Sequence, residues 1–109
     1  MTNVNEELLI RLTKQIRKKA IGDPKKSYTA KMFKKGRSKM AQKVGEEATE
    51  LVIEAIRNDK SKAVSESADL MFHLLVLWED MGIEVTDILK ELARREGISG
   101  LEEKASRPE

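Results

Sequence analysis

The sequence predicts an all-α protein, a helical bundle of four to five helices. Charged residues make up 37% of the 109 residues and aromatic residues only 4%, a balance typical of helix-rich proteins. The chain has only two prolines and six glycines, the residues that most often interrupt a helix. Apolar residues recur at helical spacing in several segments, and no segment shows the alternation expected of a strand.

Two helices are expected in the N-terminal third. Asn3 can cap the first helix, with Glu6 in the position of a capping box. The apolar stripe of this helix consists of Leu8, Leu9, Leu12 and Ile16. Ser27 can cap a short second helix that runs through Lys35, and Gly36 can terminate it.

The two longest helices are expected in the middle of the chain. Ser38 can cap a helix over about 39–57. Its stripe at i, i+4, i+7 and i+11 consists of Val44, Ala48, Leu51 and Ala55. Asp59 or Ser61 can cap a fourth helix over about 60–81.

Residues 68–78 of the fourth helix are apolar nearly all the way round. Such a helix lies centrally in a bundle or is covered by another chain, so we expect a homodimer. Thr86 can cap a last helix that ends near Arg95. The remaining residues, 97–109, are expected to form a flexible tail.

Length and composition indicate one domain over 1–109, with its core at about 5–95. The absence of cysteine excludes disulfides, thiolate zinc sites and a cysteine nucleophile. The single histidine, His73, excludes a histidine-rich zinc site. The N-terminus does not resemble a signal peptide, and the longest apolar stretch, 70–78, is too short to span a membrane. We therefore expect a cytoplasmic protein.

Charge is distributed very unevenly along the chain. Residues 1–43 hold thirteen Lys/Arg and three Asp/Glu, a balance of +10, whereas residues 44–109 have a balance of −8. A basic segment beside an acidic helical core suggests an anionic ligand, with nucleic acid as one candidate. The alternative is that these side chains only solvate helix faces.

Four carboxylates form the most informative pattern. Glu47 and Glu50 are spaced i, i+3, and so are Glu66 and Asp69. Residues three apart lie on one face of a helix, so two neighbouring helices can direct all four carboxylates at a single cation. Carboxylate oxygens suit Mg²⁺, with Mn²⁺ as a possible substitute.

Asp69 carries particular weight because it stands within the apolar run. A buried, ionised aspartate is costly unless something compensates its charge, and a bound metal ion would do so. Such a site favours attack of water on a phosphorus atom of a polyphosphate. His73, one turn later, is expected to be a packed, hydrogen-bonded core residue or otherwise a partner of Asp69.

Further candidate residues flank the carboxylates. Glu46 can orient a ligand, act as a base through water, or merely be solvated, whereas Glu54 is expected to be an exposed helix residue. Tyr28 and Trp78 can stack on a base, but core packing is the default for both. The basic side chains that can hold phosphates are Lys34, Lys35, Arg37, Lys39 and Lys43.

Three segments together carry a resemblance to a known family. They are residues 27–31 (Ser-Tyr-Thr-Ala-Lys), 39–48 (Lys-Met-Ala-Gln-Lys-Val-Gly-Glu-Glu-Ala) and 65–75 (Ser-Glu-Ser-Ala-Asp-Leu-Met-Phe-His-Leu-Leu). The acidic pattern resembles that of the all-α, MazG-like nucleoside-triphosphate pyrophosphatase superfamily. Within it, the strings around Glu47 and Asp69 are more similar to the phosphoribosyl-ATP pyrophosphatases, over about residues 5–95.

The resemblance implies Mg²⁺-dependent hydrolysis of phosphoribosyl-ATP to phosphoribosyl-AMP and pyrophosphate, the second step of histidine biosynthesis. It implies a homodimer with intertwined four-helix bundles, and a cyclohydrolase, expected as a separate protein, that acts on the product. Carried onto this chain, it implies that the metal ligands are Glu47, Glu50, Glu66 and Asp69, with Glu46 as a helper.

Two other functions remain open at this stage. A house-cleaning pyrophosphatase for free or damaged nucleoside triphosphates would use the same acidic face. A non-enzymatic helical interaction module, perhaps one that binds nucleic acid through the basic segment, would leave Asp69 unexplained, and no base-reading motif accompanies the basic residues.

Overall fold

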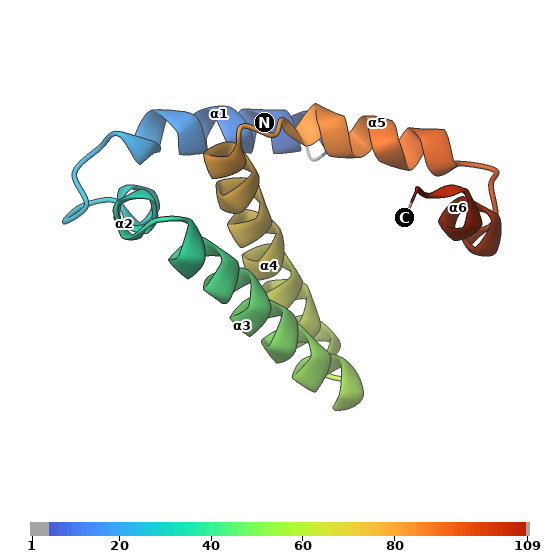
Figure 1. Cartoon of the computed structure of the whole chain (residues 1–109). Coiled ribbons are helices and arrows are strands. Elements are labelled where there is room, and N and C mark those ends of the chain that lie inside the picture. Colours follow the sequence, from blue (N-terminus) through green and yellow to red (C-terminus); the bar gives the residue numbers. More distant parts are fainter. Residues whose placement is uncertain (1–4, 109) are drawn as a thin grey trace.

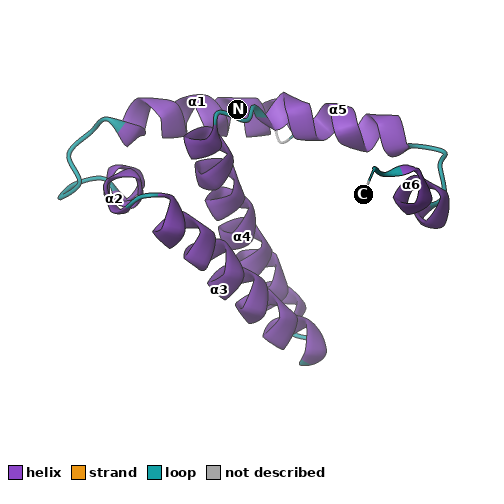
Figure 2. Ribbon diagram, viewed as in Figure 1, coloured by secondary structure: helices purple, strands orange, loops and turns teal. Residues whose placement is uncertain are grey.

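The computed structural model describes residues 5–108 and folds them into six α-helices, with no strand in that range. The helices are α1 (Glu6–Ala20), α2 (Tyr28–Lys35), α3 (Arg37–Ile56), α4 (Lys60–Met81), α5 (Val85–Arg95) and α6 (Gly100–Ser106). α3 and α4 form a long antiparallel hairpin, and α1 and α5 lie across the end of it at which α4 finishes (Figure 1; Figure 2). The all-α prediction is confirmed, but the predicted number of helices did not include α6.

The first two helices begin at polar caps. The side chain of Asn5 caps α1 by accepting a hydrogen bond from the backbone N–H of Glu7 at 3.1 Å. The expected cap, Asn3, lies outside the described residues. Ser27 caps α2 and Gly36 ends it, as the sequence predicts. Gly36 has φ 93°, a conformation that side chains with a Cβ disfavour, and it allows a sharp turn into the next helix.

The starts of the later helices match the sequence prediction only in part. Gly36 is also the N-cap of α3, so the link from α2 is a single residue and the expected Ser38 cap is wrong. Asp59 caps α4 by accepting from a backbone N–H at 3.1 Å, as predicted. α5 begins after Glu84, which forms a reciprocal capping box, and not after Thr86.

The buried core lies where α1, α2, α4 and α5 meet the start of α3. Its members are Ile16, Met32, Met40, Leu75, Val76 and Val85. Trp78 packs against this cluster as expected, whereas Met71 and Met81, on the same helix, are each 47% exposed. Ion pairs reinforce the junction, because Arg17 forms a bidentate pair with Glu79 at 2.8 and 2.9 Å.

The apolar helix α4 is covered on only part of its surface. It packs along α3, but Val64 is 71% exposed and Asp69 is also exposed. Within one chain α4 is therefore not central in a bundle, and the other alternative, that a second chain covers it, stays a prediction. Among the described helices, only α3 runs alongside α4 over its whole length, and the helices α1 and α5 meet α4 near its C-terminal end (Figure 1).

Among residues 5–108, no helix has the length and hydrophobicity needed to cross a membrane.

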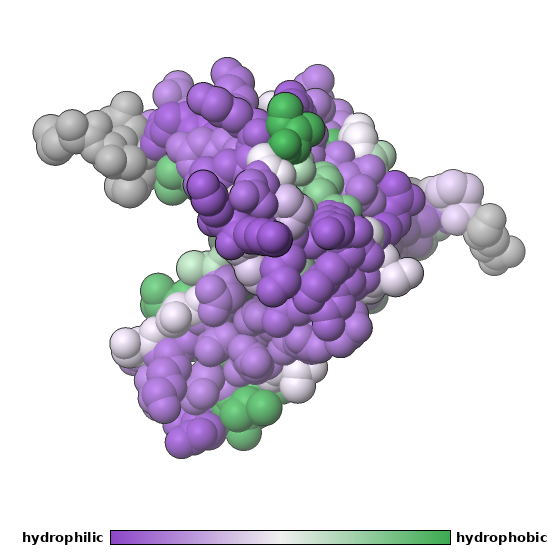
Figure 3. All heavy atoms as spheres, turned by 90° about the vertical axis from the view of Figure 1, so that its left-hand side faces the viewer, coloured by the Kyte–Doolittle hydropathy of each residue, from purple (hydrophilic) through white to green (hydrophobic). Residues whose placement is uncertain are grey.

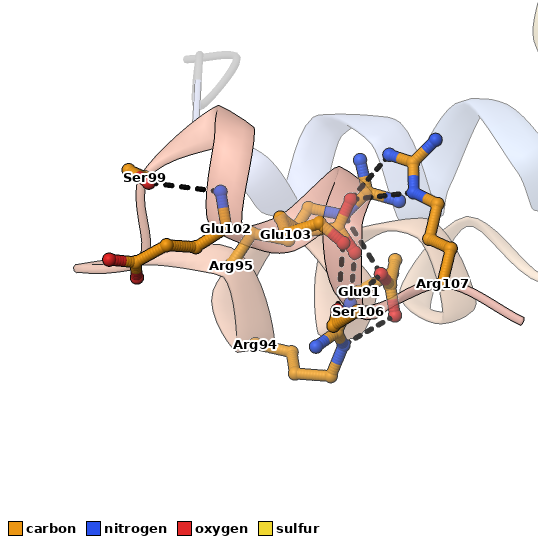
Figure 4. Close-up of polar contacts among 8 residues, drawn as sticks. All are labelled: Glu91, Arg94, Arg95, Ser99, Glu102, Glu103, Ser106 and Arg107. Carbon is orange, nitrogen blue, oxygen red and sulfur yellow. Dashed lines mark hydrogen bonds and ion pairs between the residues drawn. The ribbon is translucent and has the colours of Figure 1, made fainter.

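The C-terminal helix α6 is joined to α5 by a group of ion pairs (Figure 4). The carboxylate of Glu103 is only 5% exposed and contacts Arg94, at 2.8 Å, and Arg107. Glu91 of α5 pairs with Arg94 and Arg95, each at 2.8 Å. Part of the segment expected to be a flexible tail, Gly100–Ser106, is therefore a helix held by ion pairs.

Candidate active site

Three of the predicted carboxylates come together between α3 and α4. Glu47 comes from α3, and Glu66 and Asp69 come from successive turns of α4. Each can offer one oxygen so that these oxygens all lie within 4.8 Å of one another. The i, i+3 spacing on α4 places its two carboxylates on one face, and the antiparallel hairpin brings Glu47 opposite them. This arrangement can surround a small cation.

Glu50 lies at the edge of this acidic cluster and is exposed. It affects both neighbouring glutamates. Burial, followed by contact with Glu50, raises the pKa of Glu47. A hydrogen bond shared with Glu50, followed by burial, raises the pKa of Glu66 to about 7. The raised pKa values of Glu47 and Glu66 follow from burial beside other carboxylates, which disfavours the charged form.

Two oxygens of the acidic cluster are buried without a hydrogen-bond donor. They are Oε2 of Glu47 and Oε2 of Glu66. A buried acceptor left without a partner costs about 1–3 kcal/mol. A hard divalent cation bound by carboxylate oxygens would satisfy both atoms and offset the repulsion. The residues present therefore fit a metal ion of this type.

Lys43 is the cation nearest to the acidic cluster. Its Nζ lies 3.1 Å from Glu46 Oε2 and 3.6 Å from Glu47 Oε1. Glu46 also accepts a 2.7 Å hydrogen bond from Gln42 and is exposed, and it is not one of the three grouped carboxylates. Hydrogen bonds from Gln42 and Lys43 lower the pKa of Glu46, so it remains ionised beside the cluster.

His73 is buried behind the acidic cluster, as expected of a packed core residue, with 6% of its surface exposed. Its Nε2 atom lies 3.5 Å from the hydroxyl of Tyr28 and 4.0 Å from Oε1 of Glu47. Burial, followed by the charge of Lys43, lowers the pKa of His73. The sequence suggested Asp69 as the alternative partner of His73, but the ring nitrogen Nε2 faces Glu47. Tyr28 is 49% exposed, so the expectation that it is a packed core residue is wrong.

The basic residues proposed for phosphate binding have different surroundings. Lys34 and Lys35 line a surface hollow together with Lys25, Lys31 and Pro24. The sequence analysis missed Lys25 and Lys31, although Lys31, Lys34 and Lys35 have helical i, i+3, i+4 spacing. The face seen from the side of the α1–α2 connection is largely hydrophilic (Figure 3).

Arg37 and Lys39, at the start of α3, do not line that hollow. Arg37 donates a 2.8 Å hydrogen bond to Asp80 at the end of α4. Lys39 is half-buried, and its charge contributes to the lowered pKa of Glu46. Lys39 therefore influences the ionisation of Glu46 beside the acidic cluster, whereas Arg37 joins α3 to α4.

Glu54 departs from the sequence prediction. Its side chain is only 13% exposed, and its Oε1 atom is buried 3.9 Å from Nε of Arg57 without a hydrogen bond. The expectation of an exposed glutamate is therefore wrong. The spacing of acidic residues alone does not reveal this burial.

Comparison with known proteins agrees with the geometry. Residues 9–96 match the family "Phosphoribosyl-ATP pyrophosphohydrolase". The chain is 51% identical over 104 residues to a phosphoribosyl-ATP pyrophosphatase of Azospirillum brasilense, covering 95% of this chain and 94% of the relative. It is 52% identical over 101 residues to the enzyme of that name from Novosphingobium aromaticivorans, covering 93% and 94%. For the Gluconobacter oxydans protein of the same name, the identity is 43% over 108 residues, covering 98% and 81%. The chain therefore belongs to the phosphoribosyl-ATP pyrophosphohydrolase family.

Proposed function

We propose that this protein hydrolyses phosphoribosyl-ATP to phosphoribosyl-AMP and pyrophosphate, as a step of histidine biosynthesis. Membership of the family supports the substrate. The observation that carries the chemistry is the convergence of carboxylate oxygens of Glu47, Glu66 and Asp69 within 4.8 Å of one another, with Lys43 beside Glu47. In this reaction the oxygen of one water bonds to a phosphorus atom, and one P–O–P linkage breaks.

The proposed cofactor is Mg²⁺, for which Mn²⁺ can substitute. Glu47, Glu50, Glu66 and Asp69 would hold it, because they supply only hard carboxylate oxygens. When bound, the ion polarises a phosphoryl oxygen and favours deprotonation of water. The unpartnered Oε2 atoms of Glu47 and Glu66 support this assignment independently of the family.

The side chains around the metal ligands would bind and orient the substrate. Lys43 and Lys39 lie one and two turns before Glu47 on α3, respectively, and can neutralise phosphate oxygens. Lys34 and Lys35, in the basic hollow, and Arg37 are the proposed contacts for more distant phosphates. Glu46 stays ionised beside Lys43 and can orient water at the edge of the site.

The proposed assembly is a homodimer in which α3 and α4 of two chains form four-helix bundles. The hairpin exposes large apolar side chains, and a second chain packed against it would shield them from water. On α3 and α4 they are Val52, Ile53, Ile56, Val64, Met71 and Met81. The product would pass to a separate cyclohydrolase, and the site of action would be the cytoplasm.

The decisive experiment is mass spectrometry of the products formed from phosphoribosyl-ATP in water labelled with heavy oxygen. We expect phosphoribosyl-AMP and pyrophosphate, with one labelled oxygen in one of them, which also identifies the phosphorus attacked. A panel of ordinary and modified nucleoside triphosphates is the comparison. Faster turnover of that panel would replace the proposed substrate with a house-cleaning activity, and Glu47→Gln should be inactive on both.

A further inference from the structure

We propose that His73 is a positioning residue for Glu47: its Nε2–H holds one oxygen of the Glu47 carboxylate and thereby directs the other oxygen into the acidic cluster. The inference deepens the proposed function and rests on it, because it concerns the metal site of that reaction. His73 touches neither the substrate nor the ion and acts only through Glu47.

The surroundings of His73 fix the plane of its ring. The residue lies on α4, one turn after Asp69, and is 6% exposed. The ring of Tyr28 packs edge-on against it, with centroids 5.7 Å apart and planes at 80°. Phe72 packs similarly at 5.4 Å and 80°. Because edge-to-face contacts with two aromatic rings restrict rotation, Nε2 keeps its direction toward Glu47 and the Tyr28 hydroxyl.

The charge of the Glu47 carboxylate favours the ring proton on Nε2. The other ring nitrogen, Nδ1, is buried and has no hydrogen-bond partner, so it is unsatisfied with or without a proton. Nε2 lies 3.5 Å from the Tyr28 oxygen, which can accept a hydrogen bond, and 4.0 Å from Oε1 of Glu47. Because a lone pair on Nε2 would face a negative carboxylate, the neutral ring carries its proton there and presents a donor to Glu47.

The two oxygens of Glu47 have different surroundings. Oε1 faces His73 at 4.0 Å and Lys43 at 3.6 Å, whereas Oε2 is buried without a partner. Lys43 is shared with Glu46 and is more exposed, so His73 is the more rigid of the two partners. A shift of about 1 Å would bring the Nε2–Oε1 distance into hydrogen-bond range. This contact would hold Oε1 and leave Oε2 for the ion.

Tyr28 extends this arrangement to a third helix. It is the first residue of α2, which Ser27 caps, and its hydroxyl faces Nε2 of His73. The start of α2 is therefore connected through His73 to the carboxylate of Glu47 on α3. Removing only the hydroxyl, as in Tyr28→Phe, should weaken the positioning without removing the donor.

The test measures Mn²⁺ affinity by calorimetry in the absence of substrate, with folding checked by circular dichroism. Loss of a group that orients a metal ligand typically weakens binding roughly 10- to 100-fold. We expect that loss for His73→Leu, which keeps an apolar side chain but has no donor. His73→Gln should stay close to wild type because its amide nitrogen can reach the place of Nε2. His73→Asn should weaken binding because its shorter amide cannot, and Tyr28→Phe should have a smaller effect.

The outcomes separate this inference from the proposed metal site. Wild-type affinity in folded His73→Leu would overturn the positioning role, as would equal weakening in His73→Gln and His73→Asn. If His73→Leu does not fold, the Gln and Asn pair decides. Glu47→Gln should lose binding in any case. If wild type does not bind Mn²⁺, or Glu47→Gln binds it equally well, the proposed metal site fails and the inference fails with it.

Discussion

Arg37 joins the start of α3 to the end of α4 through Asp80, with its Nε donating to Oδ2 at 2.8 Å and its terminal nitrogen donating to the Asp80 carbonyl at 3.2 Å. Arg37 thus closes the hairpin at the end opposite the α3–α4 turn. Both side chains are partly exposed, so the ion pair is expected to contribute only about 0–1 kcal/mol.

This contact separates a structural role from a substrate-binding role for Arg37. We expect Arg37→Ala to lower the melting temperature slightly and Asp80→Ala to lower it similarly, because each removes the same pair. If Arg37 also contacts phosphate, Arg37→Ala will raise KM for phosphoribosyl-ATP while Asp80→Ala will not. Steady-state kinetics beside thermal unfolding measure both effects, and an equal KM in the two variants would exclude the phosphate contact.

The acidic cluster is the most direct target for mutation. Glu47→Gln and Asp69→Asn each remove a charge from the proposed metal ligands. We expect turnover to fall by more than the roughly 10- to 100-fold that is typical when a residue that only orients a metal ligand is changed. The variants should remain folded, because each change is isosteric. Glu54→Gln, one turn beyond Glu50 and outside the cluster, is the matched control and should retain turnover. Full activity of Asp69→Asn would remove Asp69 from the site.

The raised pKa of Glu66 predicts a pH-dependent stability in the absence of metal. The unfolded chain loses this proton near pH 4.5, whereas the folded protein retains it until about pH 7. Between these values the folded state binds more protons, so the free energy of unfolding falls as pH rises. With chelator present, wild type should lose melting temperature relative to Glu66→Gln between pH 5 and 8. Parallel curves for the two proteins would contradict the shift.

Metal binding should reverse that loss. An ion that binds only the folded state stabilises it according to its concentration and affinity. Adding Mg²⁺ at pH 8 should therefore raise the melting temperature of wild type, and chelation should lower it again. Asp69→Asn should recover part of the stability lost on chelation, because it removes one of the mutually repelling charges. A melting temperature that chelator does not change would mean that the acidic cluster is not strained.

The ion pairs between α5 and α6 predict a stability change in the acid range. Hydrogen bonds from Arg107 and from Arg94, which reaches across from α5, lower the pKa of Glu103. The lowered pKa stabilises the contact above about pH 4.5, and the contribution is lost as pH falls below that value. Hydrogen exchange should therefore show α6 losing protection at acid pH before the rest of the protein.

A mutation at neutral pH tests the same contacts. Glu103→Gln should speed amide exchange in α6, because three arginines lose the carboxylate that they approach. Glu102→Gln is the matched control, since the Glu102 side chain points away from the ion pairs between α5 and α6 (Figure 4). If the two variants exchange equally, the ion pairs do not hold α6.

The apolar surface of the hairpin predicts the assembly state. Val64 is 71% exposed on α4, and we expect Val64→Glu to convert the proposed homodimer into monomers by burying a charge at the interface. Ile21→Glu is the control, because Ile21 is 91% exposed in the connection between α1 and α2. Light scattering measures the mass of each variant. A wild type that is already monomeric would exclude the proposed assembly.

Sequence-based prediction succeeded where the structural cause is local. Ser27 and Asp59 cap their helices as expected, since a side-chain oxygen and a nearby backbone N–H suffice for a cap. The i, i+3 pairs also follow from helical periodicity, so Glu66 and Asp69 share a face. Prediction failed at Ser38 because Gly36 serves both helices, which depends on how α2 and α3 meet.

The amino-acid order was sufficient to identify the first five helices, the acidic pairs and the class of reaction, because caps, periodicity and spacing act over a few residues. Packing in three dimensions was needed to show that Glu47 is the buried carboxylate and Asp69 the exposed one. It was also needed to show that His73 faces Glu47, and that Arg37 is held by Asp80. These relationships join residues 26 and 43 positions apart, and the distance along the chain carries no information about which side chains meet once the helices pack.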